Sequence, residues 1–345
     1  MYVPVMKNRT VEIAVIKKAL ENGLSSNIIP LIEVVQEKSR VNLKLKSFSE
    51  EIKILFKDTN NKFFVDIINR PVSNNVNPTV QEFVTNNNRD STFTIKSLLS
   101  CSEINNCIPV LSYDDIELLE EEKVLNDIEK LRAKFDNIAI RLSPTQYNVL
   151  SNVLFEILKE NDYFLFDIQK NKHTSPSLSK SFKKIKNEKT GKKINTILLV
   201  DNKPTDHVNV GIIDGKLIDE IDVSYLEDYK KDIYSNFDGV ADYVGVTSVL
   251  PTKGGAISPA GIYYSRKDNK FVGYRYRDDK RVMSEFKDHI RPEIMNSEFW
   301  KQYSEEHHTN CEGCKTISDA TGKTQGAWKG VTMSHYIYTL DEYDI

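Results

Sequence analysis

The amino-acid sequence predicts a closed (β/α)8 barrel of the TIM type, with a C-terminal β-hairpin and a helical or irregular extension. Short apolar, β-branched runs alternate along the chain with polar stretches of helical periodicity. About eight such units follow one another, and the runs are apolar on both faces, as in a parallel sheet covered by helices. The alternative, an open Rossmann-like sheet, would want a glycine-rich turn after the first strand, whereas Met6-Lys7-Asn8-Arg9 contains no glycine.

Each predicted strand is a short run rich in Val, Ile, Leu, Phe or Tyr. The eight runs are 2–6, 28–35, 63–67, 108–111, 138–142, 163–168, 196–200 and 243–249. The stretches between these runs place apolar residues on one face of a helix. They are 10–20, 48–56, 80–99, 116–135, 146–158, 178–193 and 218–237.

The pattern changes after the eighth run, so we predict a barrel core over 1–253 and a second part over 254–345 packed on it. The second part begins with a β-hairpin within 260–277, whose two apolar runs flank a polar turn. A helix is expected over 283–303, broken or offset at Pro292. The Cys- and His-containing tail that follows has little periodicity.

The overall charge excludes some partners. The chain of 345 residues carries 47 Lys and Arg against 50 Asp and Glu, a formal net charge of −3. No global positive field would draw it onto nucleic acid or anionic lipid, so such binding would need a local patch. There is no apolar leader segment and no apolar run of membrane-spanning length, so we expect a cytoplasmic protein without a membrane partner.

Charged or hydroxyl-bearing residues close most of the apolar runs. In a (β/α)8 barrel the carboxyl ends of all strands meet at one mouth, where functional residues lie. The residues at these positions are Lys7, Glu33, Asp66, Ser112, Asp114, Arg141, Asp167, Asp201, Thr247 and Ser248. We therefore expect them to converge on a single polar pocket.

Such a pocket predicts metal-assisted hydrolysis of a phosphate-bearing substrate, as in a phosphodiesterase or nuclease. Carboxylates are ligands that Mg2+ prefers, and the predicted metal ligands are Glu33, Asp66, Asp167 and Asp201. The candidate catalytic residues are Glu33, Asp66, Asp167 and Lys7. The candidate substrate-binding residues are Arg141, Asp114, Thr247 and Ser248. The alternative is that these acids and bases pair with one another and cap helix N-termini.

A Cys-x-x-Cys pair in the tail, Cys311 and Cys314, has the spacing of half a zinc site. The candidates for the other two ligands are His307, His308 and His335. The alternative is a pair of thiols that stabilises a turn around Gly313.

The hairpin 260–277 interleaves aromatic and cationic side chains. They are Tyr263, Tyr264, Arg266, Lys267, Lys270, Tyr274, Arg275, Tyr276 and Arg277. This mixture suits stacking plus phosphate contact with a nucleic acid, and it equally suits a protein interface. Because the net charge is not positive, we favour a protein partner.

Several short segments are distinctive when taken together. They are Tyr2-Val3-Pro4-Val5-Met6-Lys7, Ile29-Pro30-Leu31-Ile32-Glu33, Phe64-Val65-Asp66, Ile108-Pro109-Val110, Ile140-Arg141-Leu142, Phe166-Asp167, Asp242-Tyr243, the hairpin, Cys311-x-x-Cys314 and the ending from Trp328 to Ser334-His335. Together they resemble the beta-protein family of phages and bacteria. The family often ends in a His-His pair, whereas this chain has Ser334 at the first position, so no role is assigned to that pair.

The resemblance implies a barrel and an association with phages or with bacterial defence against them, and it brings no settled reaction. Two functions therefore stay open. One is a barrel enzyme acting on an anionic small molecule or a nucleic acid. The other is a non-catalytic recognition component of an anti-phage defence system.

Overall fold

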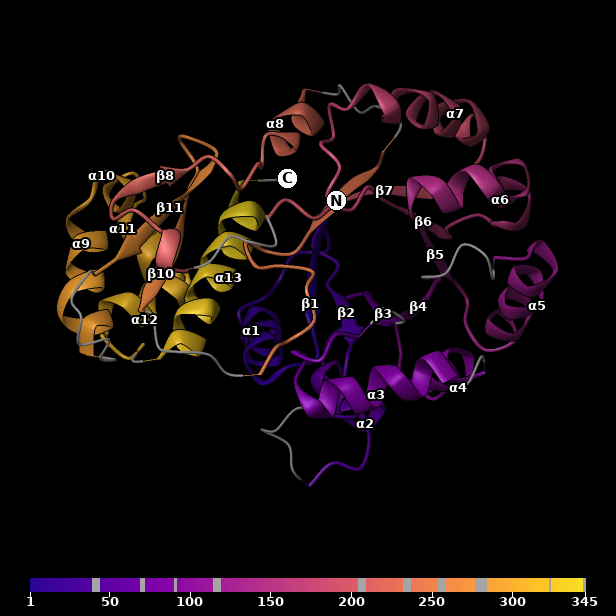
Figure 1. Ribbon diagram of the computed structural model, residues 1–345, viewed down its shortest axis with the longest axis horizontal. Helices are drawn as coiled ribbons and strands as arrows, with labels where there is room; N and C mark the ends of the chain where they lie inside the picture. Colours follow the sequence, from indigo (N-terminus) through magenta and orange to yellow (C-terminus); the bar gives the residue numbers. More distant parts are fainter. Residues whose placement is uncertain are drawn as a thin grey trace.

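Eight parallel strands close into a barrel in the computed structural model of the chain, in the order β1-β2-β3-β4-β5-β6-β7-β9 (Figure 1). Helices lie between successive strands, so the predicted (β/α)8 fold class is confirmed. The structure describes residues 1–38, 44–68, 72–89, 92–113, 119–203, 209–231, 237–253, 259–276, 284–322 and 324–343.

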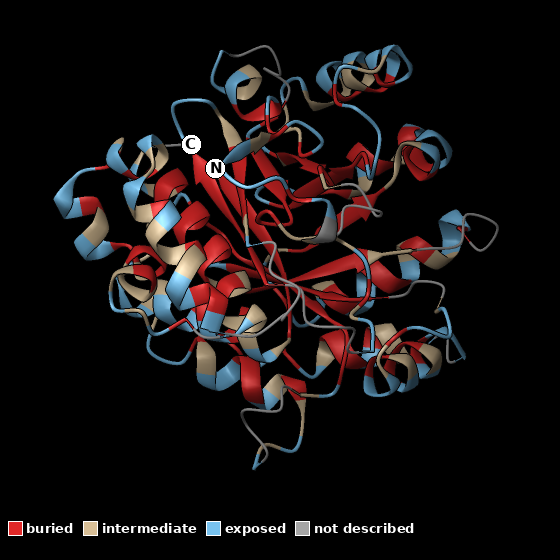
Figure 2. Cartoon of the chain, turned by 60° about the vertical axis from the view of Figure 1, so that its left-hand side comes forward, coloured by how far each residue is buried: buried red, intermediate tan, exposed pale blue. Residues whose placement is uncertain are grey.

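The barrel strands are short apolar runs that are buried along nearly their whole length (Figure 2). They are β1 (Tyr2–Lys7), β2 (Leu31–Val34), β3 (Phe63–Ile67), β4 (Cys107–Ser112), β5 (Ala139–Leu142), β6 (Tyr163–Asp167), β7 (Asn195–Val200) and β9 (Gly239–Asp242). The register pairs Lys7 with Glu33 and Glu33 with Asp66, so the residues that close neighbouring strands lie at one level of the barrel.

The eighth strand differs from the prediction. We expected it over 243–249, whereas β9 ends at Asp242. The chain turns directly after it, where Val244 and Gly245 have positive φ angles of 55° and 70°. This turn makes 244–250 a loop at the barrel mouth, and Thr247 and Ser248 belong to that loop.

Eight helices cover the barrel within the described residues, and each turns an apolar face inward (Figure 2). They are α1 (Thr10–Glu21), α2 (Phe48–Leu55), α3 (Pro78–Arg89), α4 (Phe93–Leu99), α5 (Glu121–Arg132), α6 (Pro144–Ile157), α7 (Ser179–Lys189) and α8 (Tyr225–Lys230). Local sequence explains where they begin: α6 starts with a capping box between Ser143 and Gln146, and Pro144 occupies the first turn.

The C-terminal extension contains a three-stranded antiparallel sheet in the order β10-β11-β8. Its strands are β8 (Lys216–Ile218), β10 (Ala260–Ser265) and β11 (Lys270–Arg275). The predicted hairpin is therefore correct, and β8 joins it from a segment that precedes the boundary predicted near 253. That boundary lies beside residues 254–258, which are outside the described part of the chain.

Helices cover this small sheet (Figure 1). They are a π-helical turn (Phe286–Ile290), α9 (Arg291–Asn296), α10 (Glu298–Lys301), α11 (Glu305–Asn310), α12 (Glu312–Ser318) and α13 (Gln325–Glu342). The predicted helix over 283–303 is thus divided, with an offset just before Pro292. Proline is tolerated there because the N–H groups of a first helical turn have no intrahelical acceptor.

The tail, in which the sequence shows little periodicity, contains a regular helix, α13, that is 18 residues long. This helix lies between α1, α12 and β10. Its buried residues therefore point in several directions rather than along one stripe, and such a helix shows little amphipathic period. No described helix combines the length and apolar character needed to cross a membrane.

Candidate active site at the barrel mouth

Five side chains form a buried cluster at the carboxyl ends of the strands, which we call the acid cluster. Its centre is Arg141, which is 4 % exposed. Arg141 Nη1 donates to Glu33 Oε1 at 2.9 Å and to Asp66 Oδ2 at 2.8 Å. Its Nε and Nη2 donate to Asp167 Oδ2 at 3.0 and 2.8 Å. Nη2 also donates to the Tyr243 hydroxyl at 2.7 Å.

These contacts engage all five N–H donors of the guanidinium. Burial alone would lower the pKa of Arg141, but Tyr243 and the three carboxylates together raise it well above its usual value. Glu33, Asp66, Asp167 and Arg141 are therefore brought together as predicted, and they pair with one another. Their catalytic, metal-binding and substrate-binding roles stay predictions.

Burial raises the pKa of the Asp66 carboxyl, and Arg141 and Ser112 oppose that shift only in part. The Ser112 hydroxyl donates to Asp66 Oδ1 at 2.5 Å. A carboxyl group with a raised pKa at a pocket is suited to hold and deliver a proton.

Lys7 connects the acid cluster to the loop after β9. Its Nζ lies 3.7 Å from Glu33 Oε2 and 5.1 Å from the centre of the Tyr243 ring. The same ammonium donates to the carbonyl oxygen of Thr247 at 2.8 Å.

A pocket of about 280 Å³ lies over one side of the acid cluster, and we call it the acidic pocket. Among the residues that line it are Asp66, Arg141, Asp167, Lys170, Asp201 and Ser248. Asp201 Oδ2 accepts from the Ser248 hydroxyl and lies 2.7 Å from Lys170 Nζ. Asp201 Oδ1 is buried and, within the described residues, receives no hydrogen bond.

The four predicted Mg2+ ligands do not form one group of converging oxygen atoms in the described part of the chain. There, three or more His, Cys, Asp or Glu side chains converge at His307, Cys311, Cys314 and His335 instead. Glu33, Asp66 and Asp167 already accept from Arg141, whereas Asp201 contacts Lys170 and Ser248 through Oδ2 and has a buried Oδ1 that accepts no hydrogen bond within the described residues.

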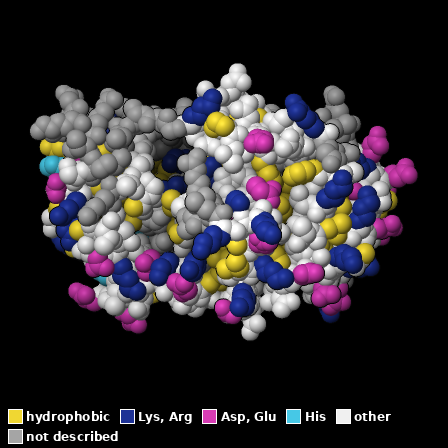
Figure 3. Space-filling model, turned by 90° about the horizontal axis from the view of Figure 1, so that it is seen from below, with side chains coloured by type: hydrophobic (Ala, Val, Ile, Leu, Met, Phe, Trp, Pro, Cys, Tyr) yellow, Lys and Arg dark blue, Asp and Glu magenta, His cyan; other side chains and the backbone are white. Residues whose placement is uncertain are grey.

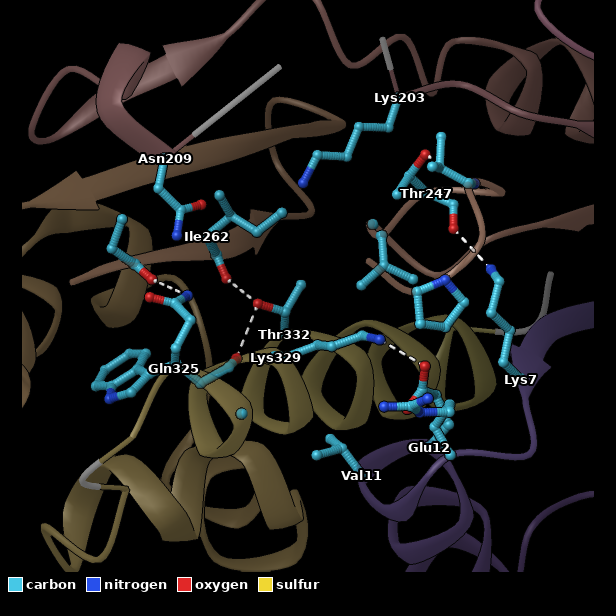
Figure 4. Close-up of a pocket in the computed structure, with 18 of the residues that line it drawn as sticks. Lys7, Val11, Glu12, Lys203, Asn209, Thr247, Ile262, Gln325, Lys329 and Thr332 are labelled. Atoms are coloured by element: carbon cyan, nitrogen blue, oxygen red, sulfur yellow. Dashed lines mark hydrogen bonds and ion pairs between the residues drawn. The ribbon is translucent and has the colours of Figure 1, made fainter. Parts of the chain in front are cut away.

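A second, larger pocket of about 510 Å³ lies between the barrel mouth, β10 and α13 (Figure 4). We call it the cationic chamber, because the charged residues that line it in the described part of the chain are Lys7, Arg9, Lys203, Lys329 and one acid, Glu12. Lys329 Nζ lies 2.5 Å from Glu12 Oε1, so this acid is paired with Lys329. The face drawn in Figure 3 has a hollow in which Lys or Arg side chains are visible.

Lys203 extends into the open space of the chamber (Figure 4). Burial, together with the nearby charges of Lys329 and Lys170, lowers the pKa of Lys203 to about 8. Within the described residues, no carboxylate forms an ion pair with it. A group of like charges around a pocket is stabilised when an anion binds among them.

The structure separates the remaining predicted site residues. Thr247 lines the cationic chamber and Ser248 lines the acidic pocket, so this loop divides the two. Asp114 lies outside the described residues.

Sequence reasoning missed Lys170 and Tyr243 in the acidic pocket and Arg9, Glu12, Lys203 and Lys329 in the cationic chamber. Tyr243 and Lys203 follow β9 and β7 within two or three residues, so a wider window at the strand ends would have included them. Lys329 lies on α13 in the tail, where no periodic signal existed.

The hairpin places its aromatic residues inside the extension. Tyr263, Tyr264 and Tyr274 are at most 3 % exposed, whereas Tyr276 is exposed. A protein partner at 260–277 stays a prediction, and it would have to contact other side chains than these three.

The chain is thus defined as a (β/α)8 barrel protein with an acidic and a cationic pocket at the carboxyl ends of its strands. A family model described as Beta protein matches residues 2–340, and the chain belongs to this family. The resemblance inferred from the short motifs is therefore confirmed. No curated protein matches the chain.

Among solved structures, the chain is similar to a β-glucuronidase from Ruminococcus gnavus in complex with a C6-substituted uronic isofagomine. The TM-score is 0.36 and the sequence identity 10 %, and the match covers 70 % of this chain. The match spans 43 % of the length of that enzyme.

Proposed function

We propose that this protein is a barrel enzyme that hydrolyses a small phosphate-bearing substrate at its mouth. The observation that carries the proposal is Lys203, which extends into the cationic chamber and forms no ion pair with a carboxylate in the described part of the chain. A phosphate group would supply the missing counter-charge, since lysine and arginine bind phosphate by charge-assisted hydrogen bonds. The volume of about 510 Å³ favours a small molecule, because small-molecule sites typically fall in this range.

The acidic pocket supplies the acid–base groups of the proposed reaction. Hydrolysis joins a water oxygen to phosphorus, for which the water gives up a proton, and breaks the bond to the leaving oxygen, which takes up a proton. Asp66 is suited to provide that proton, because burial raises its pKa. Asp201 is suited to orient the water or a Mg2+ ion, because its Oδ1 atom is buried without a donor among the described residues.

Binding can be tested by calorimetry with inorganic phosphate and pyrophosphate. We expect Lys203→Met to weaken pyrophosphate binding by roughly tenfold or more, since a charged hydrogen bond is lost. The matched control is Lys193→Met, whose side chain is 78 % exposed and pairs with Glu160 on the surface. Equal affinities for wild type and Lys203→Met, or no binding to either, would contradict an anion site in the chamber.

The pH dependence provides a second measurement of the same site. The protonated form of Lys203 attracts the anion, and its pKa of about 8 lies far below that of an ordinary lysine. Affinity of the wild type should therefore fall as the pH rises through this value. The Lys203→Met variant should lack this step.

Turnover can be tested with a chromogenic nitrophenyl phosphate ester, with and without Mg2+ or Mn2+. Asp66→Asn and Asp201→Asn should reduce the rate while pyrophosphate still binds, because the chamber is intact. If pyrophosphate binds but no phosphate ester is hydrolysed, the proposed hydrolysis is refuted and the protein is a phosphate-binding protein. A role in phage–bacterium conflict is what the family resemblance implies, and it stays an expectation.

A further inference from the structure

Four metal-ligating side chains meet inside the C-terminal extension, away from the barrel mouth. His307 lies on α11, Cys311 and Cys314 flank the start of α12, and His335 lies on α13. All four residues have 0 % exposure, and their ligand atoms lie within 4.8 Å of one another.

Three distances within this group, all measured from His335 Nδ1, match the edges of a tetrahedron around a zinc ion. His307 Nε2 lies 3.4 Å from His335 Nδ1. The sulfur atoms of Cys311 and Cys314 lie 3.7 and 3.6 Å from the same Nδ1. A zinc ion about 2.05 Å from nitrogen and about 2.3 Å from sulfur requires about 3.4 Å between two nitrogens and about 3.6 Å between nitrogen and sulfur.

The outer partners of both histidines determine which ring nitrogen carries the proton. His335 Nε2 lies 3.0 Å from the carbonyl oxygen of Tyr264, which can only accept. His307 Nδ1 lies 2.7 Å from Glu342 Oε2, a carboxylate oxygen. Each neutral ring therefore donates outward and turns a lone pair toward the other ring. Carboxylate and carbonyl partners of this kind orient the histidines of metal sites.

Two facing lone pairs at 3.4 Å repel each other unless a proton or a metal ion lies between them. His335 Nδ1 also has both sulfur atoms as neighbours. Its single lone pair cannot accept a hydrogen bond from each of these groups. The backbone N–H of Cys314 donates to Cys311 Sγ at 3.4 Å, which stabilises a thiolate.

We propose that His307, Cys311, Cys314 and His335 bind a structural zinc ion. The set is complete, with two nitrogen and two sulfur ligands, and it is buried, so no position is left open for a substrate. The ion would tie α11 and α12 to α13. Because Lys329 on α13 lines the cationic chamber, the same ion would hold one wall of that chamber in place.

Metal analysis of the full-length protein tests the proposal. We expect close to one equivalent of zinc per chain in the purified protein. After removal of the metal with a chelator and a thiol reagent, Co2+ should produce the intense visible absorption of a tetrahedral site with thiolate ligands. Protein that contains no zinc and gives no such cobalt spectrum would refute the site.

Substitutions distinguish the ligands from their neighbours. Cys314→Ser and His335→Gln should each lose at least nine-tenths of the bound zinc. The matched control is His308→Gln: this residue follows His307 directly but stacks on Trp300 at 3.9 Å, so its variant should keep the metal.

A second control keeps the test decisive if a ligand variant fails to fold. Cys101→Ser/Cys107→Ser removes the other two buried cysteines and should leave the zinc content unchanged. Zinc lost from this variant or from His308→Gln, but kept in Cys314→Ser, would overturn the assignment. So would mass spectrometry that finds Cys311 and Cys314 joined as a disulfide in freshly purified protein.

Discussion

Arg141 illustrates how one residue organises the barrel mouth. Its guanidinium, on β5, lies among three carboxylates that three other strands, β2, β3 and β6, contribute. Buried carboxylates are costly without a counter-charge, and the guanidinium fork can contact several at once. The residue that looked like a substrate contact in the sequence is therefore first of all the group that allows this acid cluster to be buried.

Removing this charge should be strongly destabilising. We expect Arg141→Met to lower the free energy of unfolding by about 3–5 kcal/mol at neutral pH, because three buried carboxylates lose their partner. Without Arg141 the pKa of Asp66, which burial already raises, rises further in the folded state, which then binds a proton more tightly than the unfolded state. The loss of stability should therefore grow as the pH rises through this raised pKa and shrink in acid.

Urea unfolding at neutral and mildly acidic pH measures both effects. Arg132→Met is the matched control, since Arg132 pairs with one buried carboxylate, Asp162. The backbone N–H groups of Ile138 and Lys159 still donate to that carboxylate. The free energy of unfolding should therefore fall less in Arg132→Met than in Arg141→Met. Equal losses in the two variants, with no pH dependence, would contradict the role of Arg141 as shared counter-charge.

At the scale of elements, the pattern of apolar residues predicted the strands more closely than the helices. The ends of the first six barrel strands could be read from the sequence to within about a residue, because a strand buried on both faces ends where a polar residue appears. Lys7, Glu33, Asp66, Arg141 and Asp167 were found in this way. The eighth strand was shifted, since the apolar residues after Asp242 belong to a loop whose positive φ angles leave no periodic signal.

The helix α13 in the tail gave no periodic signal for a different reason. An isolated amphipathic helix shows a stripe, whereas α13 is enclosed by α1, α12 and β10 and is apolar on several sides. The chamber residues that it contributes, such as Lys329, could therefore not be predicted. They become visible only when the extension is packed on the barrel.

Gly313 lets α12 approach α13 closely. A Cβ atom at this position would lie 2.6 Å from the carbonyl oxygen of Val331 and 2.9 Å from the backbone nitrogen of His335. We expect Gly313→Ala to cost about 1–3 kcal/mol, because backbone atoms must move. Thermal or urea unfolding measures the change. Gly211→Ala is the control, since no heavy atom lies within 4 Å of its Cβ; a similar loss there would refute the packing explanation.

At the scale of the whole molecule, the barrel and the extension share one apolar core. A single cluster of buried side chains joins barrel residues to Met333, Tyr336, Ile337 and Leu340 of α13. The Tyr336 hydroxyl donates to Asp242 Oδ2 at 2.7 Å, at the end of β9. Tyr2 and Tyr225 donate to the same carboxylate. These contacts indicate that the two parts are stabilised together.

This shared core predicts one cooperative unfolding transition, which the placement of the tryptophans makes measurable. Both tryptophans, Trp300 and Trp328, lie in the buried core of the extension, so their fluorescence reports on that part. Far-ultraviolet circular dichroism is dominated by the larger barrel. We expect the two signals to give the same urea midpoint, as a two-state transition requires.

Tyr336→Phe should lower both midpoints together. It removes a hydrogen bond to a carboxylate, which should lower the free energy of unfolding by roughly 1.5–3 kcal/mol. Tyr276→Phe, at an exposed tyrosine, should leave both unchanged. A fluorescence transition that precedes the dichroism transition would mean that the extension unfolds on its own, and that the chamber can open without loss of the barrel.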